Sequence, residues 1–311
     1  MKQRVTRRRS LACEVLIVGG GPAGLSAALM LGRCARQVLL CDAGQPRNRK
    51  TNAVHGLLSR DGSDPKDLLE LGRRELRSYP GIAIRSCRVT KVRRMKSGFR
   101  AFLSDGRRVD AQRVLLATGV VDHLPALRGF ESIYGRSAFH CPYCDAWEWR
   151  ERRIAVYGRG SAGKALALKL SHWSRDVVVC TDGVSEWTAR ERGTLSRAGI
   201  PTIETRIASL ASRGSKLGAI VFRDGRRLGR DVLFFTLGQT PLCSIAAELG
   251  CELTSKGEIR VSRKGSTSVS GLYVAGDVSS RSQFVATAIA EGAEAAVAIH
   301  ESLIAEASRR R

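Results

Sequence analysis

The fold of this chain is decided by residues 14–24, which read EVLIVGGGPAG. The mostly apolar start of this stretch predicts a buried strand, and its glycines predict a tight turn where the strand ends. A helical pattern follows over residues 25–31, and a second strand over residues 37–41 ends at Asp42. Strand, glycine turn, helix, second strand and an acid about 20 residues further on together indicate a dinucleotide-binding unit.

The glycines of this turn each have a physical reason. Gly19 permits the tight turn, Gly21 lets the backbone approach a pyrophosphate, and Gly24 lets the helix pack against the strand. The helix N-terminus supplies N–H groups and partial positive charge to phosphates. Asp42 is placed to accept a hydrogen bond from a ribose hydroxyl.

A second unit of the same kind occupies the middle of the chain. Residues 154–163 read IAVYGRGSAG and again carry a strand into a G-x-G-x-x-G turn. A helix is predicted over residues 164–173, followed by a strand over residues 177–180. The residues of this unit predicted to contact a nucleotide are Gly158, Gly160, Gly163 and Asp182.

The remaining segments repeat and then complete this pattern. An Asp-Gly hairpin follows each unit and leads into an apolar strand that ends in glycine, at Gly119 in the first copy and Gly238 in the second. A strand over residues 272–275 then ends in Gly276-Asp277, and an alanine-rich helix runs from about residue 283 to residue 304. We therefore predict an α/β fold with two Rossmann-like domains, one inserted in the other, with boundaries at residues 1–121, 122–243 and 244–311.

Length and composition exclude several classes of protein. The 311 residues are 43% hydrophobic and 26% charged, which permits a packed core and excludes wholesale disorder. No run approaches the roughly 18 apolar residues of a membrane span. The first apolar run enters a glycine turn rather than a signal-peptide cleavage site, so we expect a cytoplasmic protein without membrane contact.

The net charge of +23 arises from 52 Lys and Arg against 29 Asp and Glu. Such a charge is compatible with nucleic-acid binding or with an acidic partner. However, the basic residues are spread over the chain, and none of their runs is interleaved with aromatics as in a single-strand binding groove. The favoured interpretation is a solvated basic surface with no specific nucleic-acid partner.

The chemistry is indicated by residues 139–145, which read FHCPYCD. Of nine cysteines, only Cys141 and Cys144 form a C-x-x-C. Zinc would need two further ligands at comparable spacing, and no second C-x-x-C exists, so no metal is predicted. Two thiols separated by a turn can instead close a reversible disulfide. Pro142 stiffens that turn, and Asp145 is placed to move a proton as a thiolate forms or leaves.

The order of these motifs resembles that of the low-molecular-weight thioredoxin reductases. The resemblance rests on the two glycine turns, Ala117-Thr118-Gly119, residues 141–145 and Gly276-Asp277, and it covers essentially the whole chain after Glu14. It is closest to the thioredoxin-reductase-like branch with a Cys-Pro-Tyr-Cys centre. That branch includes flavoprotein dithiol oxidases that close disulfides in natural products such as gliotoxin and holomycin. Residues 47–49, 54–56 and 291–293 also look like this branch.

This resemblance implies FAD in the discontinuous domain and a nicotinamide nucleotide, NADPH or NADH, in the inserted domain, which carries the cysteine pair. It implies that Cys144 lies next to the flavin, that Cys141 exchanges with substrate and that Asp145 is the acid/base. A homodimer is implied as well. Two simpler interpretations stay open, with Asp277 as a helix cap and His55 as a loop histidine. The residues implied to hold FAD are Gly19, Gly21, Pro22, Ala23, Gly24, Asp42, Asn52, His55, Ala117, Thr118, Gly119, Gly276, Asp277, Gln283, Phe284 and Val285.

Two departures from the family pattern concern the inserted domain. Thioredoxin reductases follow its second strand with a His-Arg-Arg cluster that holds the 2′-phosphate of NADPH, whereas residues 180–183 here read CTDG. Asp182 would repel a 2′-phosphate and could hold the free 2′-hydroxyl of NADH, or the domain could keep its fold without using a nicotinamide. Secondly, Ala146 replaces the glycine usual after the redox motif, which could alter how that turn meets flavin or substrate.

The leading hypothesis is an FAD-dependent dithiol–disulfide oxidoreductase. In the reductive direction, NAD(P)H reduces FAD, FAD reduces the Cys141–Cys144 disulfide, and Cys141 attacks a disulfide in thioredoxin or a similar small protein. In the oxidative direction, a small-molecule dithiol reduces the cysteine pair and oxygen finally removes the electrons. The opposing hypothesis is a non-enzymatic flavin or nucleotide sensor, which would keep its binding without the two thiols.

Overall fold

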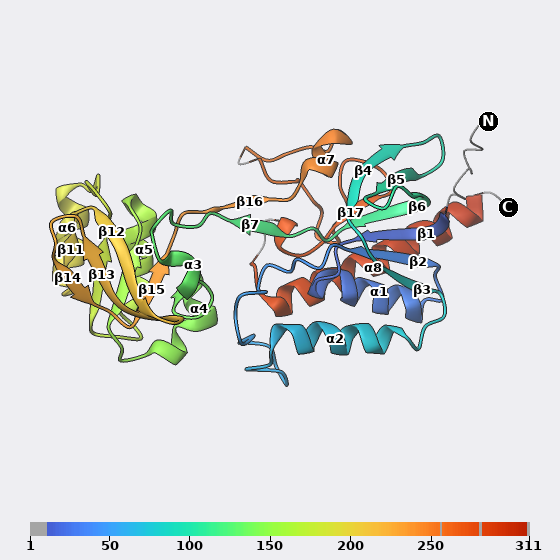
Figure 1. Cartoon of the computed structure of the whole chain (residues 1–311). Coiled ribbons are helices and arrows are strands. Elements are labelled where there is room, and N and C mark those ends of the chain that lie inside the picture. Colours follow the sequence, from blue (N-terminus) through green and yellow to red (C-terminus); the bar gives the residue numbers. More distant parts are fainter. Residues whose placement is uncertain (1–10, 256, 280–281, 310–311) are drawn as a thin grey trace, which may run out of the picture.

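The computed structural model describes residues 11–255, 257–279 and 282–309. Figure 1 shows two lobes joined by a pair of extended segments. The joining segments are the strands β7 (Val120–Asp122) and β16 (Gln239–Pro241). The second lobe consists of residues 123–238, between these strands in the sequence. The first lobe consists of the described residues before β7 and after β16. β7 and β16 pair with each other in antiparallel fashion.

The sheet of the first lobe has the order β3-β2-β1-β6-β5-β4, and β17 also pairs with β6. Its β1, β2, β3, β6 and β17 pair in parallel, whereas β4, β5 and β6 form an antiparallel meander. The last four residues of β1 are buried because the strand lies inside the sheet, with side chains covered on both faces. The strands are β1 (Leu11–Val18), β2 (Val38–Asp42), β3 (Ile82–Ser86), β4 (Val89–Arg94), β5 (Phe99–Leu103), β6 (Arg108–Leu116) and β17 (Leu272–Val274).

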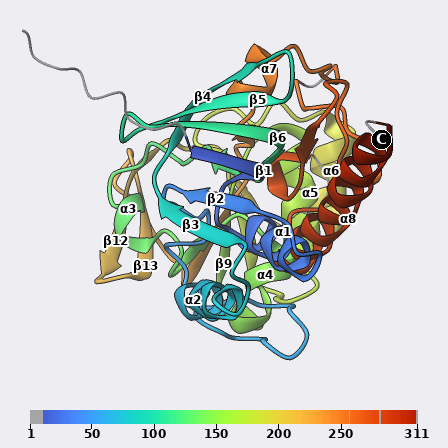
Figure 2. The ribbon, with the colours of Figure 1, turned by 90° about the vertical axis from the view of Figure 1, so that its right-hand side faces the viewer.

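Helices pack against one face of this sheet (Figures 1 and 2). In Figures 1 and 2, α1 and α8 run side by side and α2 lies next to α1. α1 starts three residues earlier than its periodicity indicated, because a proline with fixed φ suits the first turn of a helix. The helices are α1 (Pro22–Arg33), α2 (Pro65–Leu76), α7 (Ser244–Glu248) and α8 (Val285–Arg309), with a 3-10 turn η2 (Asp277–Ser279).

The second lobe contains a parallel sheet of order β11-β10-β9-β15-β8 and an antiparallel sheet of β12, β13 and β14. Its strands are β8 (Ala138–Phe139), β9 (Ile154–Tyr157), β10 (Val177–Cys180), β11 (Thr202–Ile203), β12 (Ile207–Arg213), β13 (Lys216–Phe222), β14 (Arg227–Gly229) and β15 (Val232–Phe235). Its helices are α3 (Phe130–Ile133), α4 (Pro142–Asp145), η1 (Trp147–Trp149), α5 (Gly160–Leu170) and α6 (Ala189–Arg197). The α/β class with two nucleotide-binding folds is thereby confirmed. Among the described residues, no helix is long and apolar enough to cross a membrane.

Close packing of α8 on α1 depends on a glycine, and this gives a first testable prediction. A Cβ added at Gly292 would lie 2.1 Å from the carbonyl oxygen of Ala23, a backbone atom that cannot move away cheaply. We expect Gly292→Ala to lower the free energy of unfolding by about 1–3 kcal/mol, measured by denaturant unfolding. The matched control is Gly193→Ala in α6, where the added Cβ meets only the flexible end of Arg197 at 3.4 Å and should not destabilise. An equal loss in both variants would contradict the packing argument.

Candidate active site

The first glycine turn has the geometry that a dinucleotide needs. Gly19 adopts φ +112°, and a Cβ there would lie 2.2 Å from the carbonyl oxygen of Ala117. A Cβ at Gly24 would lie 1.9 Å from the carbonyl oxygen of Gly19, whereas a Cβ at Gly21 would meet nothing within 4 Å. Within the described residues no side chain caps the N-terminus of α1 and no acid lies in its first turn. The turn is therefore free on the side where a pyrophosphate would approach.

Asp42 ends β2 beside this turn and is held in place by two donors. Its Oδ1 accepts from the Gly44 N–H at 2.9 Å, and its Oδ2 accepts from Arg73 of α2 at 2.9 Å. A Cβ at Gly20 would lie 2.5 Å from the carboxylate, so a glycine is required there as well. The sequence argument missed Gly20 and Arg73, because neither belongs to the spacing rule that identified Asp42.

The Gly276-Asp277 turn meets the first glycine turn through its backbone. Gly276 adopts φ +80°, and a Cβ there would lie 2.9 Å from the Cβ of Ala23. The buried Glu291 of α8 accepts from the Gly276 N–H at 2.8 Å and from the Ser279 hydroxyl at 2.7 Å. Glu291 therefore holds in place the turn that carries Asp277. Its position in the family-like segment 291–293 did not indicate this role.

The other residues implied to hold FAD lie around this region of the first lobe. Thr118 donates to the carbonyl oxygen of Leu242 at 2.7 Å, and Gly119 adopts φ +71°. Gln283 accepts from Arg47 at 2.7 Å, Phe284 is 41% exposed and Val285 begins α8. Asn52 is exposed. These residues fit an extended cofactor that spans from α1 to the start of α8, and their contacts with FAD stay a prediction.

Cys141 and Cys144 form a disulfide across the turn of α4. Cys141 caps α4, and its sulfur accepts from the Cys144 N–H at 3.1 Å. Between the cysteines, the exposed Tyr143 places its ring 6.1 Å from that of Trp173 in the second lobe and 6.5 Å from that of Phe284 in the first. The cysteine turn therefore contacts the segment implied to lie near the flavin.

Asp145, the implied acid/base, follows directly after Cys144. Burial, with a smaller contribution from the negative charge of Glu148, raises the pKa of Asp145 to about 7. A carboxyl group with this pKa can both accept and return a proton near neutral pH. The neighbouring Ala146 is fully buried and packs with Phe139 and Ile154 in the core of the second lobe, so its methyl group contributes to packing there.

His55 reaches from a loop of the first lobe toward the segment that follows the cysteine turn. Its Nε2 lies 3.6 Å from Oε1 of Glu148, and its Nδ1 lies 3.5 Å from Oδ1 of Asp61. The His55–Glu148 contact therefore joins the two lobes beside Asp145. The predicted contact of His55 with FAD is not tested by this arrangement.

The glycine turn of the second lobe differs from the first in its backbone, because the positive φ is at its second glycine instead of its first, and also in its surroundings. A Cβ at Gly163 would lie 2.6 Å from the backbone of Gly158, and Gly160 adopts φ +54°. The Trp187 indole N–H donates to the carbonyl oxygen of Gly160 at 2.6 Å, and the Gly160 N–H donates to the carbonyl oxygen of Ser185 at 3.4 Å. The segment after β10 is thus hydrogen-bonded to the glycine turn.

Asp182, predicted to meet a ribose, lies at the end of β10 with both carboxylate oxygens engaged. Oδ1 accepts from the Ile207 N–H at 2.7 Å, and Oδ2 accepts from the Tyr157 hydroxyl at 3.4 Å. Arg159 extends from the glycine turn to the same place, where it donates to the carbonyl oxygen of Thr181 at 2.6 Å and to that of Asp182. The sequence argument overlooked Arg159 and Trp187, since no motif assigns them a role.

Comparison with known proteins places this site in a family. The profile of the pyridine nucleotide-disulphide oxidoreductases matches residues 13–292. The chain is 30% identical to the thioredoxin reductase tcpT of Claviceps purpurea, over 94% of this chain and 95% of that protein. The crystal structure of HlmI matches with a TM-score of 0.93 at 33% identity, over 96% of this chain and 95% of the other. The putative thioredoxin reductase TrxB from Bacillus anthracis matches with a TM-score of 0.90 at 32% identity, over 94% and 99%.

These similarities extend over both lobes and include the turn that carries the disulfide. The chain therefore belongs to the pyridine nucleotide-disulphide oxidoreductase family and is an FAD-dependent disulfide oxidoreductase of the thioredoxin-reductase type.

Proposed function

We propose that this enzyme works in the oxidative direction, closing a disulfide in a small dithiol with little or no use of a nicotinamide. The observation that carries this proposal is the glycine turn of the second lobe, which is hydrogen-bonded to the chain's own segment after β10. In a βαβ unit the pyrophosphate lies at the helix N-terminus and the adenosine ribose lies between that turn and the end of the second strand. In this chain, both places have internal contacts.

Trp187 fixes the segment after β10 against the glycine turn. This side chain is 6% exposed, packs in the core of the second lobe, and donates to the carbonyl oxygen of Gly160. Lys164, in the first turns of α5, donates to Glu191 of α6 at 2.7 Å, which helps to hold α6 against α5. Among the residues that the structure describes, the start of α5 itself has no side-chain cap and no acid in its first turn, as in α1, so the restriction on a dinucleotide lies at the ribose end.

The exposed Arg159 lies at the ribose end. Its guanidinium crosses from the glycine turn to the carbonyl oxygens of Thr181 and Asp182, and it lies so close to Gly183 that a Cβ there would be 3.0 Å from Nη2. The Asp182 carboxylate is turned toward the Ile207 N–H and the Tyr157 hydroxyl. These contacts support a structural role for both residues rather than ribose binding.

The chemistry follows from the residues of the cysteine turn. A substrate thiolate attacks Cys141, the Cys141–Cys144 bond breaks, and Asp145 accepts the proton released by the substrate. The second substrate thiol then displaces Cys141, which leaves the substrate disulfide and two reduced cysteines. FAD, which the first glycine turn and the Gly276-Asp277 turn would hold, would supply the acceptor for these two electrons, and dioxygen would finally take them up as hydrogen peroxide. The net reaction is dithiol plus O₂ giving disulfide plus H₂O₂.

The surroundings of the disulfide favour a small apolar dithiol as the substrate. Tyr143 and Trp147 are 61% and 63% exposed, and Phe284 lies beside Tyr143 from the other lobe. Exposed aromatic rings next to a reactive centre provide apolar contact area for a compact ligand. Reduced thioredoxin is the protein alternative, and it serves as the comparison substrate in the test below.

The test is anaerobic stopped-flow absorbance of the purified flavoprotein, mixed in turn with NADPH, NADH, dithiothreitol and reduced thioredoxin. We expect the flavin to be bleached rapidly by the small dithiol and at least about 10²-fold more slowly by either nicotinamide. Admission of oxygen should then restore the yellow colour with one H₂O₂ per dithiol. Rapid bleaching by NADPH or NADH would overturn the oxidative proposal and establish the reductive direction instead.

Replacement of Arg159 distinguishes the oxidative direction of electron flow from the reductive one. If Arg159 fills the ribose site, Arg159→Ala should leave dithiol oxidation unchanged, and NADPH and NADH should remain poor reductants or improve equally. If instead its guanidinium holds a 2′-phosphate, the same variant should selectively weaken reduction by NADPH, by about tenfold or more. Arg226→Ala is the matched control, because Arg226 pairs with Asp224 at 2.7 Å on the surface of the same lobe. A selective NADPH loss in Arg159→Ala would contradict the proposal.

A further inference from the structure

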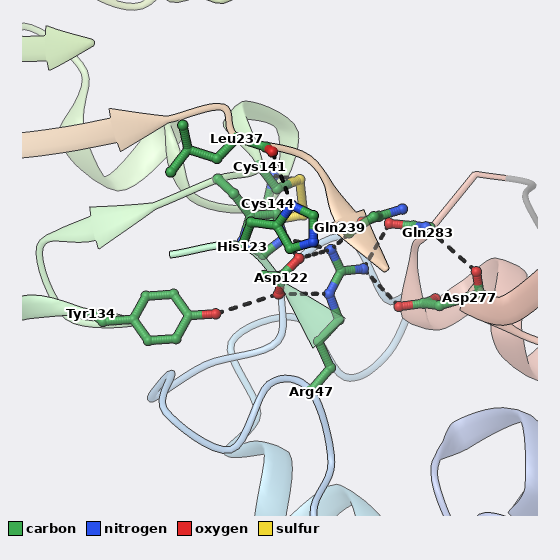
Figure 3. A network of polar contacts seen from close by, with 11 residues as sticks. Arg47, Asp122, His123, Tyr134, Cys141, Cys144, Leu237, Gln239, Asp277 and Gln283 are labelled. Carbon is green, nitrogen blue, oxygen red and sulfur yellow. Dashed lines mark hydrogen bonds and ion pairs between the residues drawn. A yellow bond between two sulfur atoms is a disulfide. The ribbon is translucent and has the colours of Figure 1, made fainter. Parts of the chain in front are cut away.

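One arginine lies where the two lobes and both joining strands meet. Arg47, from the loop after β2, is surrounded by polar groups from several parts of the chain, as Figure 3 shows. We name Arg47 with its five partners the Arg47 cluster. The partner atoms are Oδ1 and Oδ2 of Asp122 at 2.5 and 2.9 Å, Oδ2 of Asp277 at 2.7 Å, Oε1 of Gln283 at 2.7 Å, Oε1 of Gln239 at 2.9 Å and Nε2 of His140 at 3.1 Å.

These partners come from both lobes and from both joining strands. Asp277 and Gln283 belong to the first lobe, at the turn implied to hold FAD and at the start of α8. Asp122 ends β7 and Gln239 begins β16, so each joining strand contributes one residue. His140 belongs to the second lobe and immediately precedes Cys141. One guanidinium thus connects the flavin side, both joining strands and the disulfide turn.

The joining strands have the features of a hinge. Within the described residues, the chain passes between the lobes only along β7 and β16 (Figure 1). Each of these strands is preceded by a glycine with positive φ, Gly119 at +71° and Gly238 at +83°. Glycine adopts this conformation without the penalty that other residues carry, so the backbone can change direction there. A contact that bridges both strands and both lobes therefore fixes an angle that the backbone alone leaves adjustable.

The cluster is suited to a fixed geometry. The Arg47 side chain is 17% exposed and that of Asp122 is 6% exposed. Burial alone would lower the pKa of Arg47, but the hydrogen bonds and charges of Asp122 and Asp277 raise it above its ordinary value. Burial likewise lowers the pKa of His140, which favours the neutral imidazole beside the guanidinium. The planar fork binds Asp122 in bidentate fashion while its remaining N–H groups face the other partners, which an ammonium group cannot reproduce.

We propose that Arg47 is a positioning residue that holds the Cys141–Cys144 turn against the flavin-binding face, and so sets the rate of electron transfer between the two. The contact of Tyr143 with Phe284 marks the alignment that is held. This proposal rests on the family's electron path between the cysteine pair and FAD, and it is the same for either direction of flow. It therefore stands even if nicotinamide proves to be the donor.

A competing role is that Arg47 only fixes Asp277 for FAD binding. The two roles differ in what a variant loses. If Arg47 only helps to bind FAD, its replacement enlarges the FAD-free fraction of the protein, and the FAD-loaded fraction is reduced at the normal rate. If Arg47 positions the cysteine turn, its replacement leaves FAD bound. It slows only the flavin reduction that passes through the cysteines, and it changes the arrangement of the lobes.

The experiment compares the full-length wild type with Arg47→Lys and Gln239→Leu. Anaerobic flavin bleaching by dithiothreitol follows the path through the cysteines, and bleaching by dithionite bypasses them. We expect Arg47→Lys to slow the first by about 10²-fold, the order reached when reacting groups are misplaced by about 1 Å, with the second unchanged. Gln239→Leu removes a single contact and should slow the first by about fivefold, the equivalent of one ordinary hydrogen bond. Small-angle X-ray scattering should show a larger radius of gyration for Arg47→Lys.

The matched control is Arg36→Lys. Arg36 has an 18% exposed side chain and pairs with Glu14 at 2.8 Å and with His300 at 2.9 Å, all within the first lobe. The Arg36→Lys variant should keep the wild-type rates of flavin bleaching by dithiothreitol and by dithionite, and the wild-type radius of gyration. The proposal is overturned if Arg47→Lys loses FAD but bleaches normally in the loaded fraction, or if both reductants slow equally. If Arg47→Lys does not fold, an unchanged dithiothreitol rate in Gln239→Leu overturns it instead.

Discussion

Replacement of Cys141 or Cys144 by serine should reduce dithiol turnover by about 10⁴-fold or more, because serine cannot form the disulfide that carries the two electrons. FAD content should be unchanged, since neither cysteine belongs to the glycine turn of the first lobe. If Cys141 is the sulfur that exchanges with substrate, Cys144→Ser mixed with the disulfide form of the substrate should accumulate a mixed disulfide, because the Cys141 thiolate displaces one substrate sulfur and no second cysteine breaks the new bond. Steady-state oxygen consumption and intact-protein mass spectrometry provide the two measurements.

Cys34→Ser is the matched control for the cysteine variants. Cys34 is a free, partly exposed cysteine at the C-terminal end of α1, in the other lobe from the disulfide. Its turnover should equal that of the wild type. Retention of turnover in either Cys141→Ser or Cys144→Ser would contradict the assigned redox centre and favour a flavin-binding protein without dithiol chemistry. A mixed disulfide that forms only in Cys141→Ser would reverse the roles of the two sulfurs.

The second large effect is expected at Asp145. Asparagine cannot accept a proton, so Asp145→Asn should lower the rate of cysteine-pair reduction by about 10²–10⁴-fold, the range usual for a positioned general base. In the wild type the ionised carboxylate is the active form. Because burial and Glu148 raise its pKa to about 7, the ionised fraction increases with pH through this value. The rate measured by anaerobic stopped flow should therefore rise between about pH 6 and 8, and this rise should be absent in Asp145→Asn.

Glu148→Gln tests the sign of the electrostatic contribution. The negative charge of Glu148 disfavours ionisation of Asp145, so its removal should lower the pKa of Asp145 and move the rising part of the profile to lower pH. Burial is the larger cause and persists, so the pKa should stay above that of an exposed aspartate. Glu151→Gln, which removes an exposed glutamate three residues further along, is the control and should not shift the profile. A shift to higher pH in Glu148→Gln would contradict the assignment.

The dinucleotide units and the redox pair could be read from the sequence for a local reason. Close approaches such as Gly24 to Gly19, and the positive φ of Gly19, demand glycine whatever else the chain contains. The disulfide likewise joins residues three apart, so its partners are neighbours before the chain folds. Such features leave residue types at fixed spacings, which is the information that a sequence displays directly.

The roles of Arg47, Glu291, Arg159 and Trp187 could not be read in this way. Arg47 meets Asp277 across 230 residues, and Trp187 meets Gly160 across 27 residues, with no spacing rule that connects them. Burial likewise depends on the completed second lobe, and it is burial that raises the pKa of Asp145 from 3.8 to about 7. The sequence by itself therefore determined the fold class, the two glycine turns and the cysteine pair that forms the disulfide. Only the tertiary structure decided which groups contact Arg47, what surrounds the second glycine turn and why the pKa of Asp145 is raised, because long-range contacts and desolvation exist only once the chain has folded.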